Sequence, residues 1–320
     1  MLPRAPLAAS TPAPLLGIDP TLLTVATGAA AVGAVSGALG CFAYLRRQGL
    51  VGDVVSHSAL LGVVGAFVGA WLVTGEATKS LWVLIPGAIL SGSAALLLAR
   101  SVSRRTRVRE DASLGVMLAI FFGGGLLLLR WVQRRTPPIR GHAGLEDYIF
   151  GMAAAMTRAD IAMIAILGTL ATAVLLLCWK EFQAYTFDPE FARSVGLPGG
   201  FVDTLLLVTL VLGIVIGIQS VGVILMIALL VTPASAARQW TERLGSMVLL
   251  AAAFGAVSGV VGAVISASAA GFPTGPIIVL MVSAIFVVSL LFAPRRGVVA
   301  RALVRRRTRA GVAAGGGSAS

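Results

Sequence analysis

Residues 201–237 read FVDTLLLVTLVLGIVIGIQSVGVILMIALLVTPASAA and form one long apolar run. A helix needs about 20 residues to cross the ~30 Å hydrocarbon core of a bilayer, so the run is long enough for two crossings. Residues 217–220, GIQS, interrupt it, and glycine beside two polar residues favours a tight reversal. The stretch therefore predicts two membrane-crossing helices, 201–217 and 221–237.

Apolar runs of this kind recur along the chain and determine its class. The 320 residues are 58% hydrophobic and 12% charged, whereas a soluble domain carries about 25% charged residues. The runs are continuous, while strands of a membrane barrel alternate apolar and polar residues. We therefore predict an all-α fold, a polytopic membrane helix bundle of about 8–9 transmembrane helices. The other crossings are predicted at 20–45, 51–73, 80–99, 112–132, 158–179, 244–268 and 274–293.

Small residues are dense in several of these crossings. Gly255 and Gly259 form a small-xxx-small pair, which lets two helices approach closely. The pattern indicates a tightly packed bundle. It leaves open whether the packing partner lies in the same chain or in a second copy.

The two ends of the chain lack the apolar composition of residues 20–297. Residues 1–19 hold four prolines and one arginine, and we interpret them as a disordered lead-in. Residues 298–320 form a basic, then Gly/Ser-rich tail, which is either solvated or bound to anionic membrane lipid. The net charge of +12 would suggest nucleic acid for a soluble protein. Here we expect no nucleic-acid partner, because cytoplasmic loops of membrane proteins gather Lys and Arg.

The distribution of basic residues predicts the orientation of the bundle. With the C-terminus in the cytoplasm, most of the 25 Lys and Arg residues fall on the inside, as the positive-inside rule requires. A group of arginines opposes this assignment, because it falls outside: Arg130, Arg134, Arg135 and Arg140. Either the number of crossings near 130–157 differs, or a short surface or re-entrant helix lies at 145–156.

A possible metal-binding pair lies in the stretch 50–58, LVGDVVSHS. Asp53 and His57 are four residues apart, so a helix places both side chains on one face. Asp in the middle of a spanning helix costs about 2.5–3.5 kcal/mol on insertion scales, so such residues usually face a cavity or a path. A carboxylate and an imidazole together bind divalent transition metals. The alternative is a polar pair buried between helices.

A second informative segment, 186–198, follows the predicted crossing 158–179. Asp188 is suited to cap a helix, Pro189 to its first position and Glu190 to its positive end. Gly196 and then Pro198 end it. We predict a short helix outside the bilayer that includes Phe191, Ala192 and Arg193. It is either an ordinary connector or a docking element for a cytoplasmic partner.

The sequence contains little enzyme chemistry. It has no Gly-x-x-x-x-Gly-Lys-Ser/Thr phosphate loop, no His-Glu-x-x-His and no Gly-x-Ser-x-Gly, and its two histidines are His57 and His142. We therefore expect a transport subunit rather than an enzyme. A gradient-driven secondary metal carrier or channel remains the alternative, although such carriers place ionisable residues at mid-membrane and Asp53 is the one clear carboxylate within an apolar run.

With these segments, the chain resembles the integral membrane permeases of ATP-binding-cassette (ABC) importers for manganese, zinc or iron(II), the ABC-3 type metal permeases. The resemblance covers residues 20–297, and its motifs are specific in combination. The strings that carry it lie at 45–57, 144–151 (GLEDYIFG), 187–192 (FDPEFA), 221–234 and 273–294.

The resemblance implies a set of partners and roles. The permease would pair with a second copy or a sister permease in the cell membrane, above two cytoplasmic ATP-binding subunits that hydrolyse ATP. An extracytoplasmic metal-binding protein would deliver the metal. Residues 188–196 would form the ATPase-coupling helix, with Asp188, Pro189, Glu190, Phe191, Ala192, Arg193 and Gly196. Asp53 and His57 would line the metal route.

The resemblance also bears on the cargo. No cofactor would be bound permanently, and Mn2+, Zn2+ or Fe2+ would be transported. The stretches 144–151 and 273–294 resemble manganese-type members, whereas the general affinity order favours zinc at a site of nitrogen and oxygen ligands. The family usually has Ala after the histidine of the pair, where this chain has Ser58.

Overall fold

The computed structural model describes residues 20–75, 78, 80–135, 139, 158–268, 273–294 and 297–299. The predicted lead-in at 1–19, the motif at 144–151, the short helix at 145–156 and most of the tail lie outside the described residues. Within the described part the chain is all α-helix, as predicted. The helices are α1 (Pro20–Leu45), α2 (Val51–Thr74), α3 (Leu81–Arg105), α4 (Glu110–Arg134), α6 (Arg158–Leu177), α7 (Trp179–Phe187), α8 (Pro189–Ser194), α9 (Gly199–Val221), α10 (Val223–Trp240), α11 (Leu244–Ser268) and α12 (Thr274–Phe292).

Eight of the described helices are long and apolar enough to cross a membrane: α1, α2, α3, α4, α6, α9, α11 and α12. This agrees with the predicted eight or nine crossings. The crossing predicted at 221–237 corresponds to α10, an 18-residue helix that contains Pro233 and carries Arg238 in its last turn.

The break inside the run 201–237 lies later than predicted. Helix α9 continues through residues 217–220 to Val221, and the chain breaks at Gly222, whose φ is 86° and ψ 166°. Glycine adopts this conformation without the steric penalty that a Cβ brings. The polar residues Gln219 and Ser220, which suggested the reversal, remain helical. The break lies two residues after Ser220.

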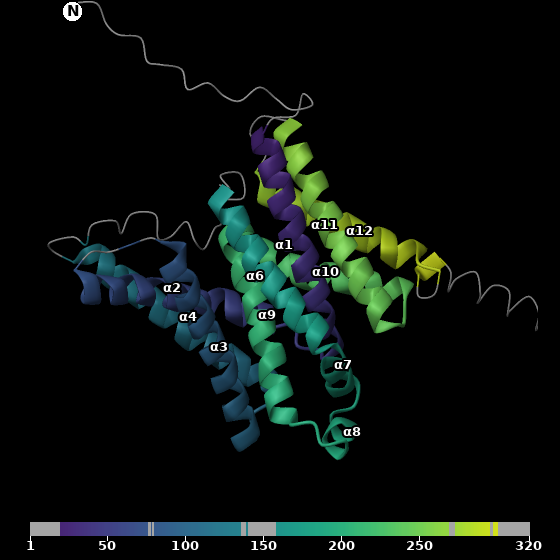
Figure 1. Cartoon of the computed structure of the whole chain (residues 1–320), viewed down its shortest axis with the longest axis horizontal. Helices are drawn as coiled ribbons and strands as arrows, with labels where there is room; N and C mark the ends of the chain where they lie inside the picture. Colours follow the sequence, from purple (N-terminus) through teal and green to yellow (C-terminus); the bar gives the residue numbers. More distant parts are fainter. Residues whose placement is uncertain are drawn as a thin grey trace, which may run out of the picture.

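The crossing predicted at 158–179 also ends differently. Helix α6 stops at Leu177, and after Cys178 the chain enters α7, a nine-residue helix that the sequence analysis did not predict. Figure 1 shows α7 and α8 together at the lower end of the bundle. Phe182 of α7 is fully buried and packs edge-on against Phe42 near the end of α1. This contact fixes α7 against the bundle.

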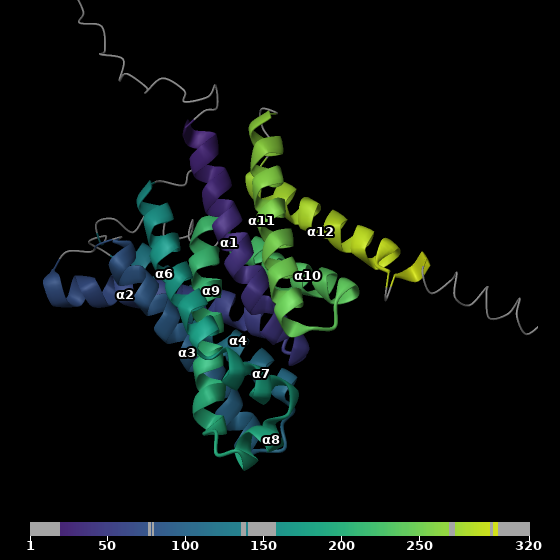
Figure 2. The ribbon, with the colours of Figure 1, turned by 45° about the vertical axis from the view of Figure 1, so that its right-hand side comes forward.

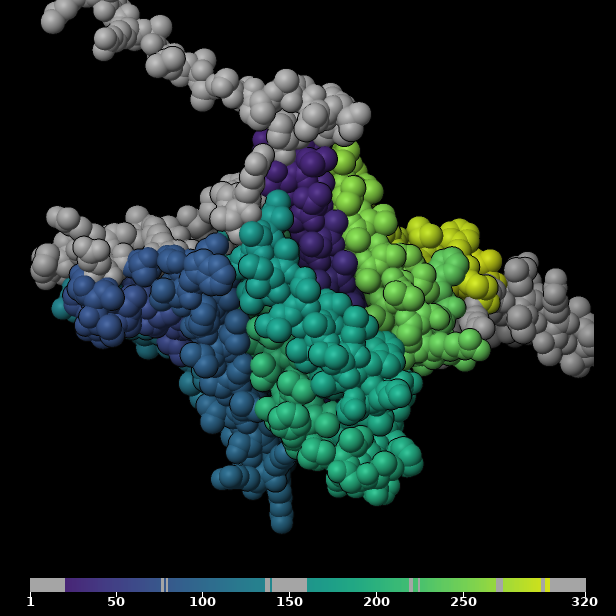
Figure 3. Space-filling view, viewed as in Figure 1, coloured from purple at the N-terminus to yellow at the C-terminus, as the bar shows by residue number. Residues whose placement is uncertain are grey.

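The helices form two groups with α9 between them. Helices α2, α3 and α4 pack on one another, and α1, α10, α11 and α12 form the other group. Helix α9 contacts members of both, α3 and α2 on one side and α1 and α10 on the other. The two groups stand on opposite sides of α9 in Figure 1, and in the turned view of Figure 2 α2 still lies on the side of α9 away from α11 and α12. The space-filling view shows the blue and green sides separated by the teal surface of α6 (Figure 3).

A close approach of α1 to α11 rests on glycine. A Cβ added to Gly255 would lie 2.0 Å from the carbonyl oxygen of Gly33, and one added to Gly259 would lie 2.5 Å from that of Ala29. The small-xxx-small pair is therefore confirmed as a packing surface, and its partner helix lies in the same chain. Backbone-to-backbone contact of this kind gives the dispersion energy that holds helices together in lipid.

We predict that Gly255→Ala destabilises the folded chain, because the added methyl group has to displace the backbone of α1. Overpacking of this kind costs about 1–3 kcal/mol. The matched control is Gly115→Ala in α4, where a Cβ meets nothing within 4 Å. Thermal unfolding of the purified protein in detergent, followed by size-exclusion chromatography, should give a lower midpoint for Gly255→Ala alone. Equal midpoints for both variants would contradict the packing described here.

Candidate functional site

Asp53 and His57 lie together on one face of α2, as their spacing predicts. The distance from Nε2 of His57 to Oδ1 of Asp53 is 3.2 Å. Asp53 lies in the first turn of α2 and not in the middle of a spanning helix, which corrects the expectation from the apolar run. In that place the positive end of the helix dipole favours a carboxylate.

The surroundings of the pair leave its two side chains partly exposed. The side chains are 28% and 35% exposed for His57 and Asp53 respectively. The Phe122 ring of α4 packs edge-on against the imidazole, with a centroid distance of 4.8 Å. Nδ1 of His57 is buried and makes no hydrogen bond in the structure. The imidazole is thus held by packing, with its Nε2 in direct contact with the Asp53 carboxylate.

The pair has the chemistry of an incomplete metal site. Imidazole nitrogen and carboxylate oxygen are ligands that suit zinc, iron and manganese. Within the described residues, no group of three or more His, Cys, Asp and Glu side chains is close enough to hold a metal ion. Two protein ligands hold an ion weakly, and weak binding allows an ion to leave again, as conduction requires.

A small apolar cavity lies behind α2, between the two helix groups. Its volume is about 30 Å³, more than the roughly 10–15 Å³ that one water molecule needs on the same measure. The lining residues come from α2, α3, α9 and α10, among them Leu60, Leu84, Val215 and Val223. Ser56 of α2 also lines the cavity, and its buried hydroxyl has no hydrogen-bond partner.

The short helix predicted after residue 186 is confirmed as α8. The Asp188 carboxylate accepts hydrogen bonds from the backbone N–H groups of Glu190 and Phe191 at 3.0 and 2.9 Å, and Pro189 takes the first helical position. Gly196 follows the helix with φ of 86°. The local sequence therefore determines both ends of this element, as helix capping requires.

Helix α8 and the residues that flank it expose apolar side chains. Phe191 of α8 is 58% exposed, and Phe187 at the end of α7 and Val195 just after α8 are exposed as well. Ala192 is fully buried and anchors α8 to the rest of the molecule. Arg193 donates from Nε to the carbonyl oxygen of Pro189, which stiffens the single helical turn. The exposed apolar side chains are a surface that a partner can cover.

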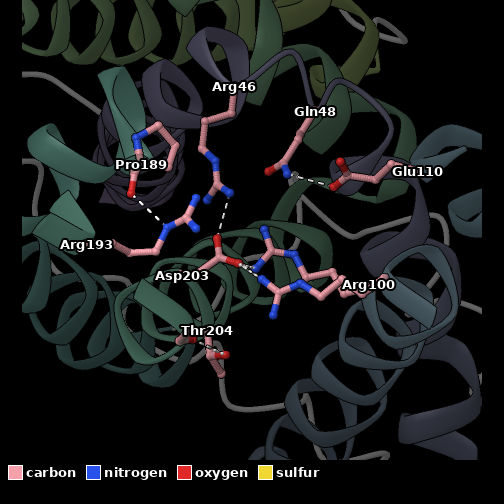
Figure 4. A network of polar contacts seen from close by, with 10 residues as sticks. Arg46, Gln48, Arg100, Glu110, Pro189, Arg193, Asp203 and Thr204 are labelled. Atoms are coloured by element: carbon pink, nitrogen blue, oxygen red, sulfur yellow. Dashed lines mark hydrogen bonds and ion pairs between the residues drawn. The ribbon is translucent and has the colours of Figure 1, made fainter. Parts of the chain in front are cut away.

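Four charged residues meet at the same end of the bundle, and we call them the Asp203 cluster. The Asp203 carboxylate of α9 is 2% exposed and accepts hydrogen bonds from Arg46, Arg100 and Arg104. The distances are 2.6 Å from Nη2 of Arg46 to Oδ1 and 3.0 Å from Nη2 of Arg104 to Oδ2. Figure 4 shows Asp203 between Arg46 and Arg100.

Two further contacts attach the cluster to its neighbours. The Arg46 guanidinium lies over the Tyr185 ring of α7, 5.3 Å from its centroid. Burial lowers the pKa of Arg46, and its interactions with Tyr185 and Glu110 oppose that shift. Gln48 donates from Nε2 to Oε1 of Glu110 at 2.9 Å. The connection between α1 and α2 is therefore tied to α4, α7 and α9 at once.

Sequence analysis missed this cluster. Asp203 belongs to the run 201–237 and was counted as part of an apolar crossing, while Arg46, Arg100 and Arg104 were used only to assign orientation. The available signal was a carboxylate near the start of an otherwise uncharged crossing, which needs a partner when buried.

Comparison with known proteins identifies the family. Residues 19–293 match the ABC 3 transport family. The zinc transport system membrane protein TroC of Treponema pallidum (strain Nichols) is 43% identical over 289 residues, which are 90% of this chain and 94% of that protein. The manganese transport system membrane protein MntC of Bacillus subtilis (strain 168) is 41% identical over 296 residues, 90% of this chain and 66% of that protein.

A solved structure, PsaBC from Streptococcus pneumoniae in complex with Fab, has the same fold. One of its chains is 30% identical and superimposes with a TM-score of 0.71, covering 87% of this chain and 93% of that chain. The family match begins just before α1 and ends just after α12, so it includes the Asp53–His57 pair, α8 and the Asp203 cluster. The chain therefore belongs to the ABC 3 transport family.

Proposed function

We propose that this chain is the transmembrane permease subunit of an ABC importer that takes up a divalent transition metal. The observation that carries the proposal is the Asp53–His57 pair, in which an imidazole nitrogen and a carboxylate oxygen lie 3.2 Å apart and both side chains are partly exposed. The names of the two similar proteins, a manganese and a zinc transport protein, support the cargo class. ATP hydrolysis belongs to a separate subunit.

Manganese remains the first choice among the cargoes, with zinc and iron(II) as alternatives. One nitrogen and one oxygen ligand suit all three ions. The accessible side of the pair leaves room for water molecules or for ligands from another chain. A second permease copy or a sister permease that brings its own ligands to this face would complete the coordination. The permease then needs little selectivity of its own, because the extracytoplasmic metal-binding protein chooses the ion.

Helix α8 is the proposed coupling helix for the cytoplasmic ATP-binding subunits. The exposed Phe191 of α8, with Phe187 and Val195 on its flanks, is the kind of apolar anchor that a groove on a partner accepts. The arginines near the starts and ends of neighbouring helices support a cytoplasmic location for this end of the bundle. The distribution of Lys and Arg along the chain favours a cytoplasmic C-terminus as well.

One of the arginines that fall outside in this orientation, Arg135, has an explanation in the structure. The Arg135 guanidinium lies over the rings of Trp71 and Trp131, at 4.6 and 4.9 Å from their centroids. Such cation–π contacts stabilise a cation at the membrane boundary without an anionic partner. An outside location of this residue is thus compatible with the proposed orientation.

Uptake into vesicles tests the function directly. The permease, its ATP-binding subunits and the binding protein are reconstituted, and uptake of Mn2+, Zn2+ and Fe2+ is measured with and without ATP. We expect uptake of at least one of these ions that requires ATP. Uptake without ATP, driven by a proton or sodium gradient, would instead establish the gradient-driven secondary carrier.

We predict that Asp53→Asn and His57→Gln each lower metal uptake at least about 10-fold, the loss that follows when even a group that only orients a metal ligand is removed. Both substitutions keep the side-chain size, so folding should be unaffected. Asp111→Asn is the matched control, because it removes an exposed carboxylate in the first turn of α4. Normal uptake by both pair variants would show that the pair is structural.

We predict that Phe191→Ala reduces recovery of the ATP-binding subunits with the permease. Burial of a phenylalanine side chain contributes about 1.5–3 kcal/mol, so affinity should fall roughly 10-fold or more. Trp82→Ala is the control, since Trp82 is similarly exposed at the beginning of α3. Affinity purification in detergent measures the recovered complex. Unchanged recovery with Phe191→Ala would exclude α8 as the docking element.

A further inference from the structure

The Asp203 cluster holds its members in fixed positions more than it stabilises the fold. Net stabilisation by a buried ion pair is small, but separation of its members leaves an unpaired buried charge and is strongly unfavourable. Asp203 is 2% exposed, and the side chains of Arg46 and Arg100 are each 13% exposed. Arg104 is 61% exposed and has water as an alternative partner. Asp203, Arg46 and Arg100 therefore move together.

On one side, the cluster is attached to α8. The four residues 195–198 separate α8 from α9, and Asp203 is the fifth residue of α9. Gly199, the first residue of α9, lies against the side chains of Tyr185 and Arg193, where a Cβ would be 3.1 and 3.5 Å from their atoms. This contact transmits a displacement of α8 to the first turns of α9.

On the other side, the cluster is attached to the connection that leads into α2. Arg46 follows α1 directly, and the turn is closed by a hydrogen bond from the Gln48 N–H to the Ala43 carbonyl at 2.9 Å. The N–H of Val51, the first residue of α2, bonds in turn to the Gln48 carbonyl at 3.2 Å. Asp53 lies two residues further on. A displacement of Arg46 is therefore passed to the turn of α2 that carries the metal pair.

The backbone of this connection ends α1 in a defined geometry. Arg47 has φ of 56°, the left-handed conformation of a residue that closes a helix. The Arg47 N–H bonds to the Tyr44 carbonyl at 3.1 Å and the Gln48 N–H to the Ala43 carbonyl, as in a Schellman motif. Arg46 and Gln48, on either side of Arg47, make the side-chain bonds to Asp203 and Glu110.

We propose that Asp203 and Arg46 are positioning residues that couple movement of α8 to movement of the start of α2. The inference rests on the proposed function, in which α8 receives the ATP-binding subunits and α2 carries the metal. Displacement of α8 moves the first turns of α9, Asp203 carries Arg46 with it, and the Asp53–His57 pair changes position. Loss of the Asp203–Arg46 contact separates ATP hydrolysis from metal movement and leaves both sites intact.

The test compares the metal ions transported per ATP hydrolysed in vesicles that contain the full transporter. We expect Asp203→Asn and Arg46→Gln to hydrolyse ATP within about 2-fold of the unmodified protein and to bind Mn2+ normally, while the transport ratio falls at least 5-fold. Arg105→Gln is the matched control, because it removes an exposed positive charge next to Arg104 on the same helix. A normal ratio in both cluster variants overturns the proposal.

A second measurement distinguishes failure of this inference from failure of the proposed function. Spin labels on α8 and on the first turns of α2 report their separation by electron paramagnetic resonance, with and without nucleotide, in complexes of the permease with its ATP-binding subunits. We expect a nucleotide-dependent change in the unmodified complex that is lost in Arg46→Gln, whatever the transported ion. The same change in both complexes overturns the coupling while the metal function stands.

The test also requires that at least one cluster variant folds. Arg46→Lys keeps the charge and removes the planar guanidinium, so it should fold and show an intermediate transport ratio. If every substitution in the cluster prevents folding, the cluster is a structural element and the proposal is overturned.

Discussion

Inside a bilayer no water is available to pair backbone N–H and C=O groups, so they have to be satisfied within helices. This constraint places the polar chemistry of the chain at helix beginnings, where free N–H groups and the dipole favour carboxylates. Asp53 lies in the first turn of α2 and Asp188 caps α8, whereas Asp203 lies in the second turn of α9 and is paired with arginines instead. The positions of Asp53 and Asp188 therefore follow from one requirement, and the Asp203 cluster meets the same need for polar partners by ion pairing.

The arrangement of the two helix groups gives these sites their relation to one another. Helix α2 belongs to one group, whereas α1, which precedes it, belongs to the other and packs on α11 through glycine. The short connection between α1 and α2 therefore passes from one group to the other. Helix α9 lies between the groups and joins them at that connection through Asp203. The chain connection between α1 and α2 and the ion pair of Asp203 with Arg46 thus lie at the same place.

Features that depend on local sequence could be predicted, and those that depend on distant contacts could not. The spacing of Asp53 and His57 and the capping by Asp188 are properties of one turn of helix, so the residues alone determine them. Asp203 has partners more than 95 residues away in the sequence, and without the fold it remained an isolated carboxylate. The break at Gly222 was misplaced because helical backbone tolerates Gln219 and Ser220 once the ladder of hydrogen bonds continues.

The apolar cavity behind α2 has a mechanical consequence. The side chains that line it, from α2 and α3 on one side and from α9 and α10 on the other, are apolar apart from Ser56. Apolar contact has no preferred direction. The helices that meet at this lining can therefore slide against one another without breaking hydrogen bonds between their side chains.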